Sequence, residues 1–247
     1  MRKTLAALLL ALPLFSVAQN RISEHNTIGW YALFVTPKIS DKVSAHIEYQ
    51  WRRTNIIEGW QQSLPRVGIN YKVNSHVTVH VGYAFIHTFP YGTYSLASVP
   101  KTFPEHRMYE QVTVTTPVGK TTLAHRLRLE QRWLGRFNSI ESAKPDTWIY
   151  LNRLRYMPRL DVPLDKHWYV AGYDEIFMGF GKNVGENIFD QNRVALLAGY
   201  RFNPTFRIEA GYLNQIVQLG REIDNKNVFQ HNNGIVLNTY INIAKRK

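Results

Sequence analysis

The chain has 247 residues, of which 45% are hydrophobic, 13% are aromatic and 19% are charged, a composition too apolar for a disordered protein. It contains no cysteine, which excludes disulfides, thiolate nucleophiles, cysteine-ligated metals and lipid attachment to an N-terminal cysteine. The net charge is +12, carried mainly by arginines that are dispersed along the chain. A basic balance can indicate nucleic-acid binding, but the N-terminal segment favours export, so we expect no nucleic-acid partner.

The first 18 residues have the layout of a secretory signal peptide. Arg2 and Lys3 precede an apolar run over residues 5–15, and the small residues of Ser16-Val17-Ala18 follow. The run is too short to span a membrane as a helix, so we expect cleavage after Ala18. No later stretch is long and apolar enough for a membrane-spanning helix. Residues 19–247 are predicted to form the single domain of the mature chain.

From residue 27 onward, apolar and polar side chains alternate with a period of two. In the segment 121–136, Leu127 and Leu129 lie on one face, and Arg128 and Glu130 lie on the other. This period is typical of a strand, whereas on a helix the charges would be spread over all faces. The pattern predicts eleven clear strands, over residues 27–36, 43–53, 62–73, 77–88, 104–116, 121–136, 146–160, 167–180, 188–202, 205–218 and 230–244.

The predicted strands and their connections favour a transmembrane barrel over a soluble sandwich. The strands are near or above the ~9–11 residues that a tilted strand needs to cross a bilayer, whereas strands of soluble proteins average ~5–6 residues. Aromatic residues such as Trp30, Trp133 and Trp168 lie toward strand ends, as expected for the two membrane interfaces. Short turns on one side and long loops on the other are typical of outer-membrane barrels, with the turns in the periplasm and the loops outside. The predicted turns are 74–76, 117–120 and 203–204, and the predicted long connections are 54–61, 89–103, 137–145, 181–187 and 219–229.

The strand count is odd, whereas bacterial single-chain barrels have even numbers of strands. The strand over residues 27–36 precedes a short connection, so it would run from outside inward, and some segment must start in the periplasm. Residues 19–26 are expected to supply this segment as a short twelfth strand. The predicted fold is therefore an all-β, antiparallel, up-and-down transmembrane β-barrel of about 12 strands, with 10 strands as the alternative.

If the apolar face of each strand meets lipid, the charged face lines the lumen. An arginine or lysine on the lipid face near the bilayer midplane would cost roughly 2–4 kcal/mol, so these side chains should point inward. In this set arginine outnumbers glutamate by eleven to five. The predicted lumen-lining residues are Glu48, Arg52, Arg66, Glu105, Arg107, Gln111, Arg126, Arg128, Glu130, Arg132, Arg153, Arg155, Glu175, Arg193, Arg201, Arg207 and Glu209.

Two functions are compatible with such a lumen. Arginines and glutamates can cross-link a narrow barrel through bidentate hydrogen bonds and so form an ionic plug with a structural role. Alternatively, the excess of arginine creates a narrow pore that prefers anions. The partners expected from the sequence are outer-membrane lipid and, for the pore, small anionic solutes.

The signals for catalysis and for bound cofactors are weak. The chain lacks the Gly-x-Ser-x-Gly motif of serine hydrolases, and its serines fall mostly in turns and loops. Of the nine histidines, His76 and His80 would lie about 13 Å apart on one strand, too far for a shared zinc ion. We therefore expect no enzyme activity, no cofactor and no metal. Two alternatives stay open: a lipid-modifying enzyme with its site on the outer rim, and a soluble exported barrel that carries a ligand among inward-facing apolar residues.

A few positions depart from the simple alternation. His106, Glu110, Asn152 and Asp174 fall on nominally lipid-facing positions, where a bulge, a shifted register or a place near an interface would explain each of them. The connection over residues 89–103 is rich in aromatic residues, and we expect it to fold as a cap over the mouth of the barrel.

Several short segments occur in a characteristic order along the chain. They are Trp30-Tyr31, Glu105–Gln111 (EHRMYEQ), His125–Trp133 (HRLRLEQRW), Arg153–Tyr156 (RLRY) and Phe189–Arg193 (FDQNR). With these segments the chain resembles, over nearly all of its mature length, the exported bacterial proteins grouped as domain of unknown function 2490, which are common in Bacteroidetes. The resemblance implies an outer-membrane β-barrel with no assigned activity.

Overall fold

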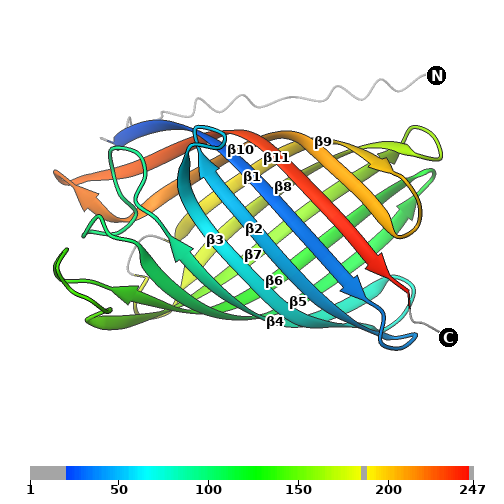
Figure 1. Cartoon of the computed structure of the whole chain (residues 1–247), viewed down its shortest axis with the longest axis horizontal. Coiled ribbons are helices and arrows are strands. Elements are labelled where there is room, and N and C mark those ends of the chain that lie inside the picture. The colour runs from blue at the N-terminus through cyan, green and yellow to red at the C-terminus, as the bar shows by residue number, and fades with distance from the viewer. Residues whose placement is uncertain (1–20, 185–187, 245–247) are drawn as a thin grey trace, which may run out of the picture.

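The computed structural model describes residues 21–184 and 188–244, so the predicted signal peptide and its cleavage site after Ala18 lie outside the described residues. No helix long and apolar enough to cross a membrane occurs among them. They form eleven β-strands, drawn in Figure 1: β1 (Arg21–Pro37), β2 (Val43–Thr54), β3 (Gly59–Lys72), β4 (Val77–Thr88), β5 (Phe103–Val118), β6 (Thr121–Arg136), β7 (Thr147–Pro163), β8 (Trp168–Phe180), β9 (Phe189–Arg201), β10 (Phe206–Ile223) and β11 (Lys226–Ile243).

The strands of the described chain close into one barrel, in the order β1-β11-β10-β9-β8-β7-β6-β5-β4-β3-β2. Strands that are adjacent in sequence pair antiparallel, as an up-and-down barrel requires. The ring closes at a seam where β1 pairs with β11 in parallel, in a register that runs from Arg21↔Asn227 to Pro37↔Ile243. The two strands run side by side in Figure 1, in blue and red. An odd number of up-and-down strands forces this arrangement, because the first and last strands then point in the same direction.

The predictions of twelve strands, or of ten, are therefore wrong: the described residues form eleven. Within the segment 19–26 that was expected to be an extra strand, residues 21–26 continue β1 without a break. The even-number rule fails here because a parallel pair closes the ring in place of a final hairpin. As a result, the described chain begins at one end of the barrel and finishes at the other.

Connections of different length gather at the two ends of the barrel. At the turn end lie the short connections 38–42, 73–76, 119–120, 164–167 and 202–205, and at the loop end lie the longer connections 89–102, 137–146 and 181–188. Two connections predicted to be long are short. Residues 55–58 are all that separates β2 from β3, and β10 and β11 meet in a two-residue turn at Asp224 and Asn225, whose φ angles are 51° and 55°. At the end of β10 the alternation of apolar and polar residues is interrupted, because the register between β10 and β11 shifts between Gln218 and Glu222.

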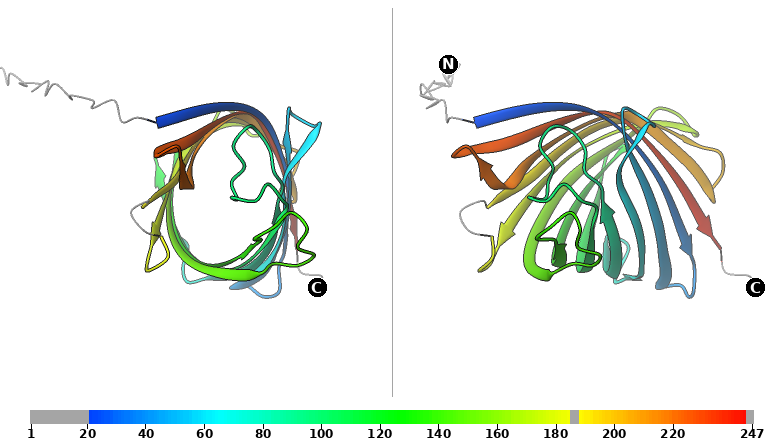
Figure 2. Two further views of the ribbon diagram at one scale, coloured as in Figure 1. Left: turned by 90° about the vertical axis from the view of Figure 1, so that its left-hand side faces the viewer. Right: turned by 60° about the vertical axis from the view of Figure 1, so that its left-hand side comes forward.

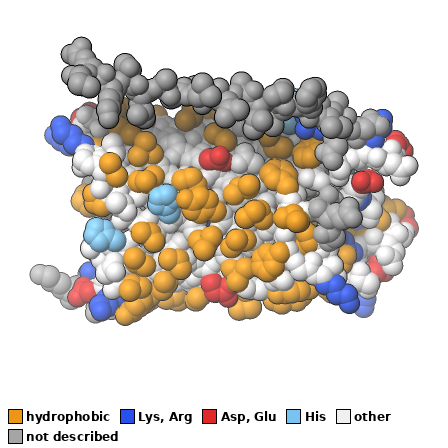
Figure 3. Space-filling view, turned by 180° about the vertical axis from the view of Figure 1, so that it is seen from behind, with side chains coloured by type: hydrophobic (Ala, Val, Ile, Leu, Met, Phe, Trp, Pro, Cys, Tyr) orange, Lys and Arg blue, Asp and Glu red, His pale blue; other side chains and the backbone are white. Residues whose placement is uncertain are grey.

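The outward positions of the strands are mostly apolar, and nearly all the charged side chains of the strands point inward. On β9, Val194 and Leu196 are exposed, whereas Arg193 and Ala195 between them are buried. Figure 3 shows hydrophobic side chains over most of the outer face that it views, interrupted by a few acidic and histidine side chains. Burial of charge inside and exposure of apolar surface outside is the reverse of a soluble protein.

The lumen is not uniformly charged. A buried cluster that includes Ile28, Trp30, Leu197 and Leu213 covers the wall near the seam. Close approach of the two parallel strands also requires a glycine, because a Cβ added at Gly234 would overlap the carbonyl oxygen of Ile28. The ionic groups therefore occupy the wall formed mainly by β2, β3 and β5–β9.

Candidate functional site

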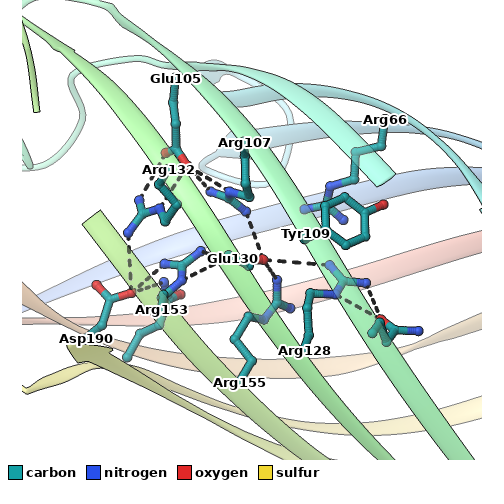
Figure 4. Close-up of polar contacts among 12 residues, drawn as sticks. Arg66, Glu105, Arg107, Tyr109, Arg128, Glu130, Arg132, Arg153, Arg155 and Asp190 are labelled. Carbon is teal, nitrogen blue, oxygen red and sulfur yellow. Dashed lines mark hydrogen bonds and ion pairs between the residues drawn. The ribbon is translucent and has the colours of Figure 1, made fainter. Parts of the chain in front are cut away.

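Glu130 is the centre of an ionic network that crosses the lumen (Figure 4). Its side chain, on β6, is fully buried. Oε2 accepts hydrogen bonds from Nε and Nη2 of Arg153 at 2.8 and 2.6 Å, and Oε1 accepts one from Nη1 of Arg155 at 2.6 Å. Arg107 and Arg128 contact Oε1 at 3.4 and 3.8 Å. One carboxylate thus links arginines from β5, β6 and β7.

A second carboxylate, Glu105 on β5, lies toward the loop end. It accepts hydrogen bonds from Nε of Arg107 at 2.7 Å and from Nε and Nη2 of Arg132 at 2.8 and 3.0 Å. Asp190, at the start of β9, pairs with Arg153 and lies 4.0 Å from Arg132. These contacts connect β5–β6–β7 to β9 across the barrel wall, as Figure 4 shows.

Glu175 on β8 forms the third node of the network. Its Oε1 accepts hydrogen bonds from Nε and Nη2 of Arg155 at 2.9 and 2.7 Å and from Nη2 of Arg126 at 2.6 Å. Arg193 on β9 lies farther away, with Nη1 3.9 Å from Oε2. Arg155 is therefore shared between Glu130 and Glu175, which joins the two nodes.

Glu48 lies on the opposite side of the lumen, on β2. Its Oε1 accepts hydrogen bonds from Nη1 of Arg66 at 2.6 Å and from Nε2 of Gln50, and its Oε2 contacts Nε2 of His46 at 3.0 Å. Arg52, two residues beyond Gln50, has no carboxylate oxygen within 4.0 Å in the described part of the chain. Its guanidinium donates instead to amide oxygens, those of Gln50 at 2.6 and 2.9 Å and Gln62 at 2.8 Å.

A separate cluster surrounds Glu209 near the turn end. Arg159 donates from Nη2 at 2.6 Å and from Nη1 at 3.3 Å, and the hydroxyls of Tyr169 and Tyr240 donate at 2.7 and 3.0 Å. Arg159 also pairs with Asp161 on its own strand. Glu209 is thereby neutralised by one arginine and two phenols.

Two buried rings support the arginines from inside the lumen. The Phe177 ring on β8 lies under the guanidinium carbons of Arg155 and Arg193, at 4.3 and 4.5 Å. The centre of the Trp30 ring on β1 lies 3.6 Å from the guanidinium carbon of Arg52 and 4.8 Å from the guanidinium carbon of Arg193. Cation–π contacts of this kind are stronger when water is excluded. The expectation that Trp30 meets the membrane interface is wrong, because its side chain is buried in the lumen, where the indole N–H donates to Gln61.

The side chains of the predicted lumen-lining residues are all buried or half-buried in the structure. Most of them belong to the nodes just described. Gln111 accepts hydrogen bonds from Nε and Nη2 of Arg128 at 2.9 and 2.7 Å. Arg201 and Arg207 lie apart from the main network, over the rings of Tyr169 and Tyr240 at 3.9 and 4.1 Å.

Sequence reasoning missed three charged members of these clusters. Arg159 and Asp161 continue the inward face of β7, so the period-two pattern carries a signal for both beyond Arg155. Asp190 has no such signal. In a simple alternation Asp190 would lie on the outward face, with Asn192. The register between β8 and β9 shifts at Phe177/Met178, however, and the Asp190 carboxylate pairs with Arg153 inside the lumen.

Two cavities lie along the lumen, one toward each end. The cavity toward the loop end has a volume of about 150 Å³, and the cavity toward the turn end has a volume of about 210 Å³. Four arginines, which we call the arginine layer, line both cavities and separate them: Arg52, Arg66, Arg155 and Arg193. A solute moving from one cavity to the other has to pass these four guanidinium groups.

Comparison with known proteins places the chain in a family. The sequence model of the family described as "Protein of unknown function (DUF2490)" matches residues 27–227. The chain belongs to this family. No curated protein matches the chain.

Two solved structures are similar to this member of the DUF2490 family. One is described as "NanC porin structure in rhombohedral crystal form": its TM-score is 0.46 and its identity 12%, over 82% of this chain and 92% of that chain. The other is a porin refined at 1.8 Å resolution, with a TM-score of 0.36 and 13% identity, over 82% of this chain and 60% of that chain. At these values neither likeness carries information on substrate or activity.

The off-pattern polar residues of this family member pair on the outer surface. Nε2 of Gln131 donates to Oε2 of Glu110 at 3.0 Å, and Nδ2 of Asn192 donates to Oδ1 of Asp174 at 2.5 Å. The two carboxylates are thus hydrogen-bonded to amides on a neighbouring strand. The described residues contain no group of three or more histidine or acidic side chains arranged to hold a metal ion.

The connection over residues 89–102 folds into one side of the mouth at the loop end (Figure 2) and contacts the seam. The Tyr91 hydroxyl donates to Oε1 of Gln230 at 2.9 Å, and burial raises the pKa of this hydroxyl above its usual value, so it stays a donor. The backbone N–H groups of Thr93 and Tyr94 donate to the carboxylate of Glu24 on β1. These hydrogen bonds attach the 89–102 connection, which we call the cap, to both strands of the seam.

Proposed function

We propose that the protein is an integral outer-membrane barrel that acts as a narrow, anion-preferring pore. The observation that carries the proposal is the polarity of the barrel, with an apolar belt outside and an excess of arginine inside. The membrane location, the signal peptide and the pore are all parts of this proposal.

The outward face of β4 gives the height of the apolar belt. On β4 the outward positions from Val77 to Phe85 are apolar, and the next is His87. From Val77 to His87 there are ten steps of ~3.3 Å, which on strands tilted by ~40° cover ~25 Å, the height of the apolar band of outer-membrane barrels. The outward position that ends the belt is also polar on six other strands, at Thr27, Ser63, Gln131, Asn152, Asn192 and Asn233.

The belt also accounts for the two outward carboxylates. Glu110 and Asp174 lie within it, but their amide partners, Gln131 and Asn192, are belt-edge residues. Long polar side chains at such positions reach toward the headgroup region. Strand segments beyond the belt, such as residues 21–26 of β1, then project from the membrane at the loop end.

A soluble ligand carrier requires the opposite polarity, with apolar residues around the ligand and polar residues outside. Here Leu196 is 66% exposed and Glu130 is fully buried. Burying the outer apolar belt in water-free lipid removes the cost that this exposure would carry in water. The polarity therefore favours a membrane barrel over a carrier.

Charge favours anions in the lumen. Arginine outnumbers glutamate by eleven to five in the predicted set, and adding Arg159, Asp161 and Asp190 reduces this excess by only one. An uncompensated positive potential in a narrow, low-dielectric passage attracts anions and repels cations. The network around Glu130 narrows the passage, so we expect a small conductance.

Planar-bilayer recording of the folded protein tests this function. We expect small unitary steps and, in a KCl gradient, a reversal potential on the anion-selective side. Arg128→Glu should move the reversal potential toward cation selectivity, whereas Lys144→Glu, the same charge change in the exposed 137–146 connection, should leave it almost unchanged. Well-folded protein that gives no steps would instead establish the ionic plug.

One observation favours a second candidate, the lipid-modifying enzyme. Ser63 and His87 are register partners on β3 and β4, at the outer edge of the apolar belt, where a hydrolase acting on lipid would need a serine and a histidine. The Ser63 hydroxyl, however, pairs with the Tyr49 hydroxyl at 3.1 Å. A phospholipid-release assay decides the matter: hydrolysis that Ser63→Ala abolishes would establish the enzyme, and we expect none from the wild type.

A further inference from the structure

The four side chains of the arginine layer line both cavities. Arg52 and Arg66 come from β2 and β3, and Arg155 and Arg193 come from β7 and β9, on the other side of the ring of strands. The four side chains therefore meet across the lumen. Their charge balance determines what can stay between the cavities.

Carboxylates neutralise this layer unevenly. Arg155 is fully paired, with Glu130 at 2.6 Å and Glu175 at 2.7 Å. Arg193 has only Glu175, at 3.9 Å. Arg52 contacts amide oxygens alone among the described residues. Two of the four guanidinium groups thus lack a close counter-charge.

These two guanidinium groups are held near each other by one ring. The guanidinium carbons of Arg52 and Arg193 lie 3.6 and 4.8 Å from the centre of the Trp30 ring. The Nε–H groups of Arg66 and Arg193 are buried and have no acceptor in the described structure. A buried donor without an acceptor costs free energy, as do like charges at short range. An anion between these side chains would relieve both costs.

We propose that the arginine layer is a binding site for a small oxyanion, the carboxylate or phosphate group of a hydrophilic solute that enters the lumen. This rests on the proposed function only in requiring that solutes reach the lumen. The planar guanidinium group matches both kinds of oxyanion through paired N–H donors, and this match gives Arg an advantage over a point charge. The site combines Arg52 and Arg193 with the free Nε–H of Arg66.

The surroundings of the layer fit a hydrated, compact anion. The adjoining cavities of about 150 and 210 Å³ have room for several waters each, since one water needs ~10–15 Å³. Two carboxylates line the cavity toward the turn end, and both are already hydrogen-bonded to arginines: Glu48 accepts from Arg66, and Glu175 accepts from Arg126 and Arg155. The anion group would therefore meet donors from three strands and two acids whose charges are paired.

Isothermal titration of the folded protein in detergent, at low ionic strength, tests the site. Inorganic phosphate and acetate are the two probes, titrated in separate arms, and the dissociation constant is measured again at several chloride concentrations. We expect binding of one anion per barrel that chloride weakens. Arg52→Gln and Arg193→Gln should each weaken it at least tenfold, because each removes charge-assisted hydrogen bonds.

Two further variants keep the test decisive. Arg207→Gln makes the same charge change at a lumen residue that lines neither cavity, and it should bind as the wild type does. Arg52→Lys keeps the charge but loses the paired donors, and it should fall between the wild type and Arg52→Gln. Each variant is first checked for the band shift of a folded barrel on unheated gels. Equal weakening by Arg207→Gln, or no binding by the wild type, would overturn the proposal.

This titration is independent of the bilayer recording. Binding without conductance would leave the site in place and reject the pore. Conductance without binding would do the reverse. A response to phosphate alone, or to acetate alone, identifies which oxyanion group the site accepts.

Discussion

Glu130 on β6 and Arg153 on β7 are register neighbours, joined by hydrogen bonds of 2.8 and 2.6 Å inside the lumen. Three further arginines contact the same carboxylate. Removing one partner of a buried ion pair is far more costly than removing both, because the remaining charge loses its compensation. The stability of the barrel therefore depends on this one acid.

We expect Glu130→Gln to lower the free energy of unfolding by about 3–5 kcal/mol. Urea unfolding followed by tryptophan fluorescence, in detergent, measures the change. The matched control is Glu110→Gln, which alters a carboxylate on the outer face. It should leave the stability unchanged or slightly raised. Equal losses for both variants would mean that the network contributes no special stability.

The hydrogen bonds between the cap and Glu24 give a second prediction. In Glu24→Ala the backbone donors of Thr93 and Tyr94 lose their acceptor. Hydrogen bonds to a charged group contribute about 1.5–3 kcal/mol, so the cap should open about tenfold more often or more. Trypsin cleavage after Lys101 reports this opening and should become correspondingly faster. Glu58→Ala, at the same end but away from the cap, should leave the cleavage rate unchanged.

The seam gives a third prediction. A methyl group at Gly234 would overlap the carbonyl oxygen of Ile28, so Gly234→Ala must push β1 and β11 apart. Overpacking of this kind costs about 1–3 kcal/mol, and it should lower the temperature at which the folded band is lost on gels. Gly220→Ala is the control, because a Cβ there meets open space. A Gly234→Ala barrel as heat-resistant as Gly220→Ala would show that the seam tolerates separation.

Orientation gives a fourth prediction, made simple by the absence of native cysteine. In intact cells, a membrane-impermeant maleimide should label Ala143→Cys, in the 137–146 connection. It should label Lys166→Cys, in the 164–167 turn, only after the outer membrane is made permeable. Leu196→Cys, in the apolar belt, should stay unlabelled in both conditions. The opposite pattern for the first two would invert the proposed orientation.

The alternation of apolar and polar residues predicted most of the fold, because it follows whether each side chain points out of the barrel or into the lumen. Residues 77–88 and 121–136 were predicted with the bounds that the structure shows, since neither strand contains a bulge. The bounds of β10 and β11 were wrong where a register shift interrupts the period near Glu222. Strand number was also wrong, because the parallel pairing of β1 with β11 leaves no local pattern in the sequence.

The candidate site was predictable in membership but not in arrangement. The alternation of side chains along each strand is enough to indicate that Arg52, Glu130 and Arg193 point into the lumen. The alternation does not tell which arginine lacks a carboxylate partner, because that depends on residues of other strands, such as Glu175 for Arg193. The role of Trp30 was missed for the same reason: its ring contacts arginines of β2 and β9.

The parallel seam has a consequence for how such a chain enters a membrane. In a barrel with an even number of strands, both ends of the polypeptide remain on the side from which it inserts, and only hairpins need to cross. Here Arg21 and Ile243 stand at opposite mouths, so in the proposed membrane location these two residues lie on opposite sides of the bilayer. Closure joins two strands that no turn connects, so one edge of β1 must stay unpaired until β11, the last strand of the ring, is in place.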